Sequence, residues 1–383
     1  MQGAWTFKGA SRGISGGCAA AMLAVVTACG GGGGSGEAAT GKLKVALTDA
    51  PACGFDHVYV SVEKIRIHRD SAASATDEGW FEISTGNTRV DLLALTNGAL
   101  EELGETPLPA GRYTQMRLVL APGGAGTPAH SVQPTGGTEL PLALPDSLQA
   151  GVVIPVDIEV APGGAADVVL DFDACKSVTP AGPGAYELNP LVSPLPRLGG
   201  GIEGVVASAL DPAATTVSAQ QDGVIVRSTR PDESGRFSIP FLRPGTYMLV
   251  VASDGRATGV VTGVPVDAAA TKVGTAGNPI ELPGSTMGEI AGSVSQADES
   301  GQAQDAVGPV PVEVRASQQL AQAGPIEVRS LPVDRVLGTY RISVPDAAPV
   351  TAPYAPSGSV SFATDGSDGG YRLDLMIRPP AGG

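Results

Sequence analysis

Two acidic clusters in this chain each lie beside a cysteine. In chain order these residues are Asp49, Cys53, Asp56, Asp171, Asp173 and Cys175. A disulfide between the two cysteines would bring the four carboxylates together, and several carboxylate oxygens at one strand end can bind Ca²⁺. One interpretation is therefore a calcium site. The alternative is that the aspartates cap turns and solvate a sheet face, in which case the protein needs no cofactor.

The three histidines do not form a recognisable catalytic or zinc motif. His57 and His68 are 11 residues apart on one expected strand, and His130 is far along the chain. Side chains alternate along a strand, so the first two face opposite sides. No G-x-S-x-G lies between a strand and a helix, and H-E-x-x-H, phosphate-loop and C-x-x-C motifs are absent from the sequence. We expect no enzymatic activity. The alternative is an unrecognised hydrolase in which His57 or His68 meets a serine or an aspartate in a cleft.

The N-terminal residues have the order of a secretory signal. Lys8 and Arg12 form a basic start, and no acidic residue precedes Cys29. Gly13–Thr27 is short and consists mostly of apolar and small residues. The sequence therefore predicts export from the cytoplasm.

The residues just before Cys29, Val26-Thr27-Ala28, resemble a bacterial lipobox. The resemblance implies that residues 1–28 are removed and that Cys29 is lipidated, with residues 29–41 as a Gly-rich tether. Gly30 is not the aspartate associated with inner-membrane retention, which favours the outer membrane. An ordinary signal peptide cut near the same point is the alternative. No apolar run of 18 or more residues follows, so we expect an anchored chain and not a spanning one.

Two cysteines remain after export. Cys18 leaves with the signal and Cys29 carries lipid, so Cys53 and Cys175 are left. In an oxidising compartment we expect these two to pair. Closing so long a loop adds about 4–5 kcal/mol in the chain-entropy account. Two separately buried thiols are the alternative.

The chain is acidic, with a formal net charge of −15. Removal of residues 1–28 takes away Lys8 and Arg12 and no acid, so the mature charge is about −17. Such a surface repels nucleic acid and anionic headgroups. We therefore exclude nucleic acid as a partner and expect the membrane to be reached only through the lipid.

Alternation with a period of two dominates the chain and predicts an all-β fold of tandem antiparallel β-sandwiches. Val152–Val160 gives the cleanest stripe of inward apolar residues. His57–His68 changes phase partway, which predicts a β-bulge near Glu63. Only Asp91–Leu103 has a pattern that a short helix could adopt.

The first predicted domain, residues 42–198, resembles the family called domain of unknown function 4382. The motifs that carry the resemblance are Leu47–Pro51, Val58–Val60, Val90–Leu93, Leu108–Leu118 and Leu170–Asp173. The family has no established activity, so the resemblance implies a surface-lipoprotein context and no chemistry. Cys53 and Cys175 lie beside two of these motifs, as in a proteobacterial subset of the family, which implies that they pair.

The second predicted domain, residues 200–284, carries D-x-x-G-x-F-x-I over Asp232–Ile239 and L-x-P-G-x-Y over Leu242–Tyr247. These motifs resemble a carboxypeptidase regulatory-like domain, which implies a transthyretin-type β-sandwich. Phe237 and Ile239 are expected to point inward.

The third predicted domain, residues 286–380, reads as a diverged second sandwich. Gly288–Val294 resembles the start of the second domain. Both Gly338–Ile342 and Gly369–Leu373 then fit the G-x-F-x-I motif, so the sequence leaves two alignments open.

Together these features predict a non-catalytic cell-envelope lipoprotein, most simply in the outer membrane, that acts in binding, adhesion or scaffolding. Its expected partners are the membrane, through the lipid, and a glycan or an envelope protein. A carbohydrate-binding lipoprotein is the alternative, with Tyr247 and Trp80, Phe81 or Tyr113 as stacking faces. Aromatic residues make up only 4% of the chain, which counts against strong glycan binding.

Overall fold

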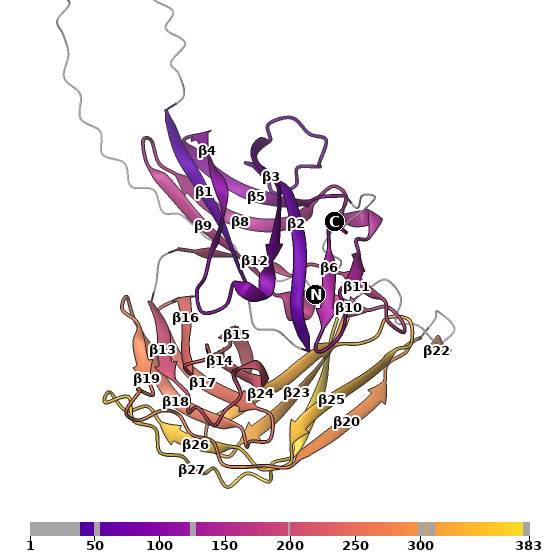
Figure 1. Ribbon diagram of the computed structural model, residues 1–383. Helices are drawn as coiled ribbons and strands as arrows, with labels where there is room; N and C mark the ends of the chain where they lie inside the picture. The colour runs from indigo at the N-terminus through magenta and orange to yellow at the C-terminus, as the bar shows by residue number, and fades with distance from the viewer. Residues whose placement is uncertain are drawn as a thin grey trace, which may run out of the picture. The chain divides into compact units, whose positions relative to one another are not determined.

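The structure is a computed structural model that describes residues 39–49, 54–122, 128–197, 200–297, 303–304 and 311–377. Residues 38–383 form one compact unit. The described residues are almost entirely strands (Figure 1), which confirms the predicted all-β fold. Their one α-helix, α1 (Ala174–Ser177), has four residues. None of the helices in these ranges is long and apolar enough to cross a membrane.

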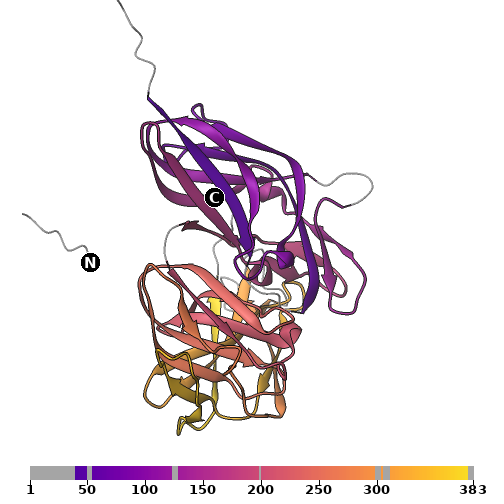
Figure 2. The same ribbon diagram turned by 60° about the vertical axis from the view of Figure 1, so that its left-hand side comes forward.

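The N-terminal module, residues 40–196, packs two sheets around one core. The first sheet runs in the order β12 (Val192–Pro196), β9 (Ala165–Phe172), β1 (Thr40–Asp49) and β4 (Glu101–Pro109). Within it, β1 is antiparallel to β4 but parallel to β9. The strands of this module, indigo to magenta, gather into one body in both views (Figures 1 and 2).

The second sheet of the N-terminal module is larger. Its order is β10 (Val178–Pro180), β11 (Tyr186–Leu188), β7 (Leu140–Ala143), β6 (Ser131–Pro134), β2 (Phe55–His68), β5 (Gly111–Leu120) and β8 (Val152–Val160), with β3 (Phe81–Asp91) also paired to β2. Apolar side chains from both sheets form a single cluster, in which Leu47, Tyr113 and Phe172 are fully buried.

Two local predictions for this module have different outcomes. The register of β2 shifts between Val62 and Lys64 against both neighbours, which confirms the bulge near Glu63. The helix expected over Asp91–Leu103 is wrong: only Leu92–Ala94 forms a 3₁₀ turn, and β4 follows. Asn97 and Gly98 both have positive φ (56° and 80°), which a helix cannot accommodate.

The middle module, residues 200–284, is also a sandwich. One sheet contains β13 (Gly200–Val205) between β16 (Arg236–Leu242) and β19 (Thr271–Val273). The other begins with β15 (Val224–Thr229), β14 (Thr215–Gln221), β17 (Gly245–Ser253) and β18 (Gly259–Val266). Phe237 and Ile239 point into the core between them, as the sequence predicted.

The C-terminal module, residues 287–377, is joined to the middle module by a shared sheet. The strand β26 (Val350–Pro353) continues that sheet by pairing in parallel with β18, and β27 (Ala363–Thr364) pairs with β26 (Figure 1). Tyr354, Val360 and Phe362 pack against the core of the middle module. No motif in the sequence indicates that the two modules share a sheet.

The remaining C-terminal strands form a smaller sandwich. One sheet pairs β20 (Met287–Ser293) with β25 (Thr339–Pro345), and the other has the order β24 (Gly324–Pro332), β23 (Val312–Leu320), β28 (Tyr371–Ile377). A short hairpin pairs β21 (Gln296–Ala297) with β22 (Ala303–Gln304). The central cluster contains six buried residues, including Val314 and Ile342.

The structure decides which segment of the C-terminal module repeats the G-x-F-x-I motif. Gly338 and Gly235 both have positive φ (64° and 77°). The Gly338 carbonyl accepts a hydrogen bond from Val294 N at 2.7 Å, as the Gly235 carbonyl does from Val206 N at 2.8 Å. Gly338–Ile342 is therefore the equivalent segment, because residues 371–377 belong to β28 in the other sheet.

Candidate functional site

Several predicted site residues fall outside the described residues. Cys29 lies there with the predicted signal and nearly all of the tether, so lipidation stays a prediction. Cys53 also lies outside, and its pairing with Cys175 stays a prediction. Gly54 and Cys175 line the same cavity.

The aspartates of the first acidic cluster accept hydrogen bonds from backbone amides. Ala174 N donates to Asp49 Oδ1 at 2.8 Å, and Asp49 is buried. Gly136 N donates to Asp56 Oδ2 at 3.0 Å. These bonds fit the alternative in which the aspartates cap turns. The ranges that the structure describes contain no group of three or more His, Cys, Asp or Glu that could hold a metal ion.

Asp171 takes part in a buried ion pair that crosses between modules. Arg227 Nη2 on β15 of the middle module lies 3.5 Å from Asp171 Oδ1 on β9. The side chains are 4% and 14% exposed, for Arg227 and Asp171 respectively. Burial raises the pKa of Asp171 above its ordinary value, although Arg227 opposes the shift. Phe241 lies beside the guanidinium, 5.7 Å from its carbon to the ring centre.

Asn97 forms a second bridge from the N-terminal to the middle module. Its Oδ1 accepts hydrogen bonds from Ser238 N and from the Thr229 hydroxyl, both at 3.0 Å. The amide N of Asn97 donates to the same hydroxyl oxygen at 2.9 Å. The left-handed backbone of Asn97 lets one residue satisfy both neighbours, and asparagine tolerates that conformation better than most residues.

Asp173 and Lys176 begin a charged cluster that continues into the C-terminal module. The Asp173 carboxylate caps α1 by accepting from Lys176 N at 2.9 Å, and it lies 3.4 Å from Lys176 Nζ. Burial alone would lower the pKa of Lys176, but the carboxylates of Asp173, Glu313 and Glu327 outweigh it and raise the pKa. The amine therefore remains charged at the boundary of the modules.

Glu327 is the most enclosed member of this cluster, since its side chain is 1% exposed. Its carboxylate pairs with Arg315 Nε at 2.9 Å. Burial raises the pKa of Glu327, while Lys176 and Arg315 pull it down. The side chain of Gln220 in the middle module makes two hydrogen bonds to the backbone of Glu327. Gln220 Nε2 donates to Glu327 O at 2.7 Å, and Glu327 N donates to Gln220 Oε1 at 2.9 Å.

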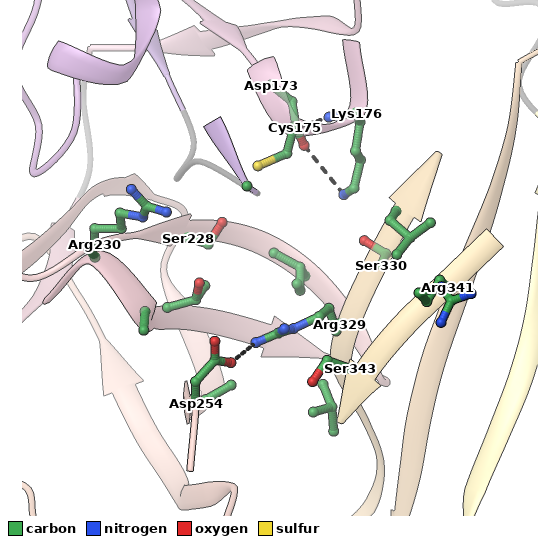
Figure 3. Close-up of a pocket in the computed structure, with 18 residues that line it drawn as sticks. Asp173, Cys175, Lys176, Ser228, Arg230, Asp254, Arg329, Ser330, Arg341 and Ser343 are labelled. Carbon is green, nitrogen blue, oxygen red and sulfur yellow. Dashed lines mark hydrogen bonds and ion pairs between the residues drawn. The ribbon is translucent and has the colours of Figure 1, made fainter. Parts of the chain in front are cut away.

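A cavity of about 350 Å³ lies beside the Asp173–Lys176 pair. Residues from all three modules line it, and Figure 3 shows the charged and hydroxyl side chains around the space. The basic lining residues are Lys176, Arg230, Arg329 and Arg341. We take this cavity as the candidate site.

The histidines have separate surroundings. His57 Nδ1 lies 2.6 Å from Asp91 Oδ2, a partner that the sequence did not suggest. His68 Nε2 lies 2.9 Å from the Glu78 carbonyl. His130 is buried against the Ala121 carbonyl, and burial lowers its pKa. Among the hydrogen bonds of the described residues, none joins His57 or His68 to a serine side chain.

Two of the aromatic residues considered for sugar stacking are core residues. Tyr113 is fully buried and Tyr247 is 3% exposed. Each hydroxyl donates to the backbone carbonyl four residues earlier, Pro109 O at 2.8 Å and Arg243 O at 2.9 Å. The expectation that they offer stacking faces is therefore wrong, because their rings fill the two sandwiches. Both belong to similar turns, Leu-Pro-Ala-Gly-Arg-Tyr and Leu-Arg-Pro-Gly-Thr-Tyr.

The ring of Trp80 is also in contact with other side chains. Arg66 lies over its ring, 4.7 Å from guanidinium carbon to ring centre, and Arg117 lies 5.5 Å away. These cation–π contacts fix the loop that precedes β3. Phe81 packs edge-on against Tyr113, with ring centres 6.0 Å apart.

The residues that converge on the cavity and on the inter-module contacts were missed by the sequence reasoning. Arg227, Arg230 and Lys176 belong to no motif, and they come together only because three modules pack on one another. No periodicity or spacing in the sequence reports such packing.

Comparison with known families accounts for two modules. Residues 40–190 match the Domain of unknown function (DUF4382), and residues 201–276 match the Carboxypeptidase regulatory-like domain. The chain carries these two domains in this order. Both resemblances expected from the sequence are thus confirmed. No curated protein matches the chain.

Solved structures give only distant similarity. The Bacillus anthracis TIE protein is 15% identical, with a TM-score of 0.15, over 81% of this chain and 44% of that one. A streptococcal ancillary pilin is 8% identical, with a TM-score of 0.18, over 80% of this chain and 88% of that one. The chain thus spans less than half the length of the first protein. At these scores we base no functional argument on the similarity.

Proposed function

We propose that this protein is a non-catalytic lipoprotein of the cell envelope, anchored in the outer membrane by a lipid on Cys29, that presents its β-modules as one rigid body for binding, adhesion or scaffolding. The observation that carries the proposal is the buried Asp171–Arg227 ion pair between modules. A passive string of independent sandwiches does not need a desolvated ion pair at its joints, and such a pair favours one defined arrangement.

The anchor in this proposal is supported by the sequence alone. The lipobox-like Val26–Cys29 follows a basic start and a short apolar segment. Three acyl chains on one residue hold a protein in a membrane more firmly than the two signals needed for stable anchoring. The acidic surface then keeps the modules away from anionic headgroups.

The absence of catalysis in this proposal is supported by the surroundings of the histidines. His57 has an acidic partner in Asp91, but a hydrolase would also need a nucleophile within hydrogen-bond reach of the ring. Replacing His57 with Ala should therefore leave the binding of the protein to the cell envelope unchanged. Loss of a hydrolytic activity in that variant would instead support the hydrolase alternative.

The test is expression of the full chain with its own leader in a bacterium that has an outer membrane. An alkyne fatty acid should label the wild type and not Cys29→Ser, and the wild type should fractionate with the outer membrane. Protease added to whole cells then reports which side the modules face. Equal labelling of both proteins, or a wild type found only in the soluble fraction, contradicts the proposal.

A further inference from the structure

The outer strand β28 of the C-terminal module has an edge that can pair with another strand. In the part of the chain that the structure describes, β28 pairs with β23 on one side and with no strand on the other. An unpaired edge presents a row of free backbone donors and acceptors, and proteins usually protect such edges with proline, shortness or a bulge.

The other outer strands of the described sheets of three or more strands each have one of these protections. Proline lies in β4, β8, β10, β12, β16 and β24, while β19 and β27 have three and two residues, and β3 and β15 have register shifts against their neighbours. By contrast, β28 has seven residues and no proline, and it pairs with β23 along its whole length without a register shift. Its free edge is therefore suited to accept a strand.

One face of β28 carries an apolar row from the core out to solvent. Tyr371 and Leu373 pack against the core of the C-terminal module. Leu375 and Ile377 continue the row, because alternate residues of a strand share a face, and they are 53% and 72% exposed. A strand added at this edge would remove part of this apolar surface from water, which is favourable.

The other face of β28 carries one charge of each sign, and this makes the strand complementary to itself. Arg372 Nε donates to Asp374 Oδ1 at 2.9 Å. When two identical strands pair antiparallel about a two-fold axis, the central residue faces its own copy, and the residues on either side of it face each other. With Leu373 at the centre, Arg372 therefore faces Asp374 of the second copy, and Tyr371 faces Leu375. With Arg372 or Asp374 at the centre, like charges face each other, which is destabilising.

We propose that two copies of this chain associate through β28, paired antiparallel about Leu373, so that the sheet of β24, β23 and β28 continues from one copy into the other. The free backbone groups of β28 then gain partners, and Leu375 of each copy lies beside Tyr371 of the other. Both copies use the same surface, so the pairing closes as a dimer and adds no third copy. The inference goes beyond the proposed function and does not depend on the lipid on Cys29.

Sedimentation velocity of residues 38–383, which form one compact unit, tests the association. A single pair of strands makes a small interface, so we expect a dissociation constant of about 1–100 μM. The mass should approach twice that of the monomer as the concentration rises through this range. A protein that stays monomeric throughout overturns the proposal, and so does association beyond a dimer.

Charge reversals test the register. Arg372→Asp and Asp374→Arg each place like charges opposite one another, so each should raise the dissociation constant at least about tenfold. An equal mixture of the two variants restores opposite charges at both positions and should associate about as strongly as the wild type. Asp157→Arg is the matched control, because Asp157 is an exposed partner of Arg112 on another outer strand, β8, and its reversal should leave the association unchanged.

A further variant covers the case in which a charge reversal does not fold, as judged by circular dichroism. Leu375→Lys changes an exposed side chain and adds a charge beside Tyr371 of the second copy, so it should also weaken association at least about tenfold. If every folded variant of β28 associates as the wild type does, the proposal is wrong. The same holds if the mixture of Arg372→Asp and Asp374→Arg associates no better than either variant alone.

Discussion

The N-terminal module and the two modules after it bury their apolar side chains in different ways. The N-terminal core is one cluster, and all of its members come from residues 43–192. The other modules have smaller clusters, and some of these combine residues from both modules. Val250 and Val260 of the middle module pack with Leu320 and Ile326 of the C-terminal module, and Phe362 packs on the core of the middle module. The first module can close its core alone, whereas the last two complete each other.

This difference shows where module boundaries in a sequence mislead. A sandwich with a full core needs nothing from its neighbours. The C-terminal module has too few apolar residues for that, and it gives β26 to the sheet of the middle module. We therefore expect the last two modules to fold only together.

The largest expected effect comes from the self-contained core. Phe172→Ala should lower the free energy of unfolding by about 3–5 kcal/mol, because a fully buried aromatic side chain leaves a cavity. Ile342→Ala, in the six-residue cluster, should cost about 2 kcal/mol, since a small cluster near solvent relaxes more readily. Urea unfolding of both variants measures the difference. A larger loss for Ile342→Ala would contradict the contrast between the cores.

The next effect concerns the joint between the regions. Asp171→Ala should cost about 3 kcal/mol, because it leaves Arg227 buried without its counter-ion. Asp167→Ala is the control on the same strand: this side chain is 39% exposed and lies 4.0 Å from Arg197, so its loss should cost at most about 1 kcal/mol. Adding Arg227→Met to Asp171→Ala should recover most of the loss. Equal stability of Asp171→Ala and Asp167→Ala would show that the ion pair with Arg227 does not stabilise the joint.

The extent to which sequence predicts this molecule follows from the same contrast. Strands such as β8 carry their own burial pattern in alternating residues, so they could be placed from sequence. The turn at Asn97 could not, because its conformation serves contacts with Thr229 and Ser238 more than 130 residues away. The cavity was equally hidden, since Lys176, Arg230 and Arg329 are ordinary surface-type residues until three modules meet.

Asn97 should have a smaller effect than the ion pair. Asn97→Ala should lower the free energy of unfolding by about 1–3 kcal/mol, since it removes the acceptor of Ser238 N and of the Thr229 hydroxyl. Asn97→Gly permits the positive φ and isolates the loss of the side chain. If Asn97→Gly is as stable as the wild type in urea, the side-chain hydrogen bonds of Asn97 contribute nothing to stability.

Buried Glu327 should give the joint a pH dependence. Its folded-state pKa is raised by burial, so its contribution to stability is fully present below its unfolded pKa and is lost as pH rises through the folded value. The stability of the wild type relative to Glu327→Gln should therefore fall as pH rises above the unfolded pKa of a glutamate, about 4.3. Exposed Glu105, whose pKa is lowered by Lys42, should give a slight change of opposite sign in Glu105→Gln. Urea unfolding over this pH range measures each difference. If the stability of the wild type relative to Glu327→Gln rises with pH, burial does not raise the pKa of Glu327.

Calcium should have the smallest effect. Asp49 and Asp56 bond to backbone amides, and Asp171 and Asp173 lie beside cations. We therefore expect the melting temperature in calcium and in chelator to agree within about 1 °C. A larger rise with calcium would restore the calcium interpretation of the acidic clusters.

The central claim, that all three modules form one rigid body, is tested most directly by unfolding residues 38–383 with two probes. Trp80 is the only tryptophan in this segment and reports on the N-terminal module, whereas far-UV circular dichroism reports on every strand. If the modules are locked together, both signals change at the same urea concentration, and Asp171→Ala separates them. If the wild type already shows two separate transitions, the modules are independent and the account is wrong.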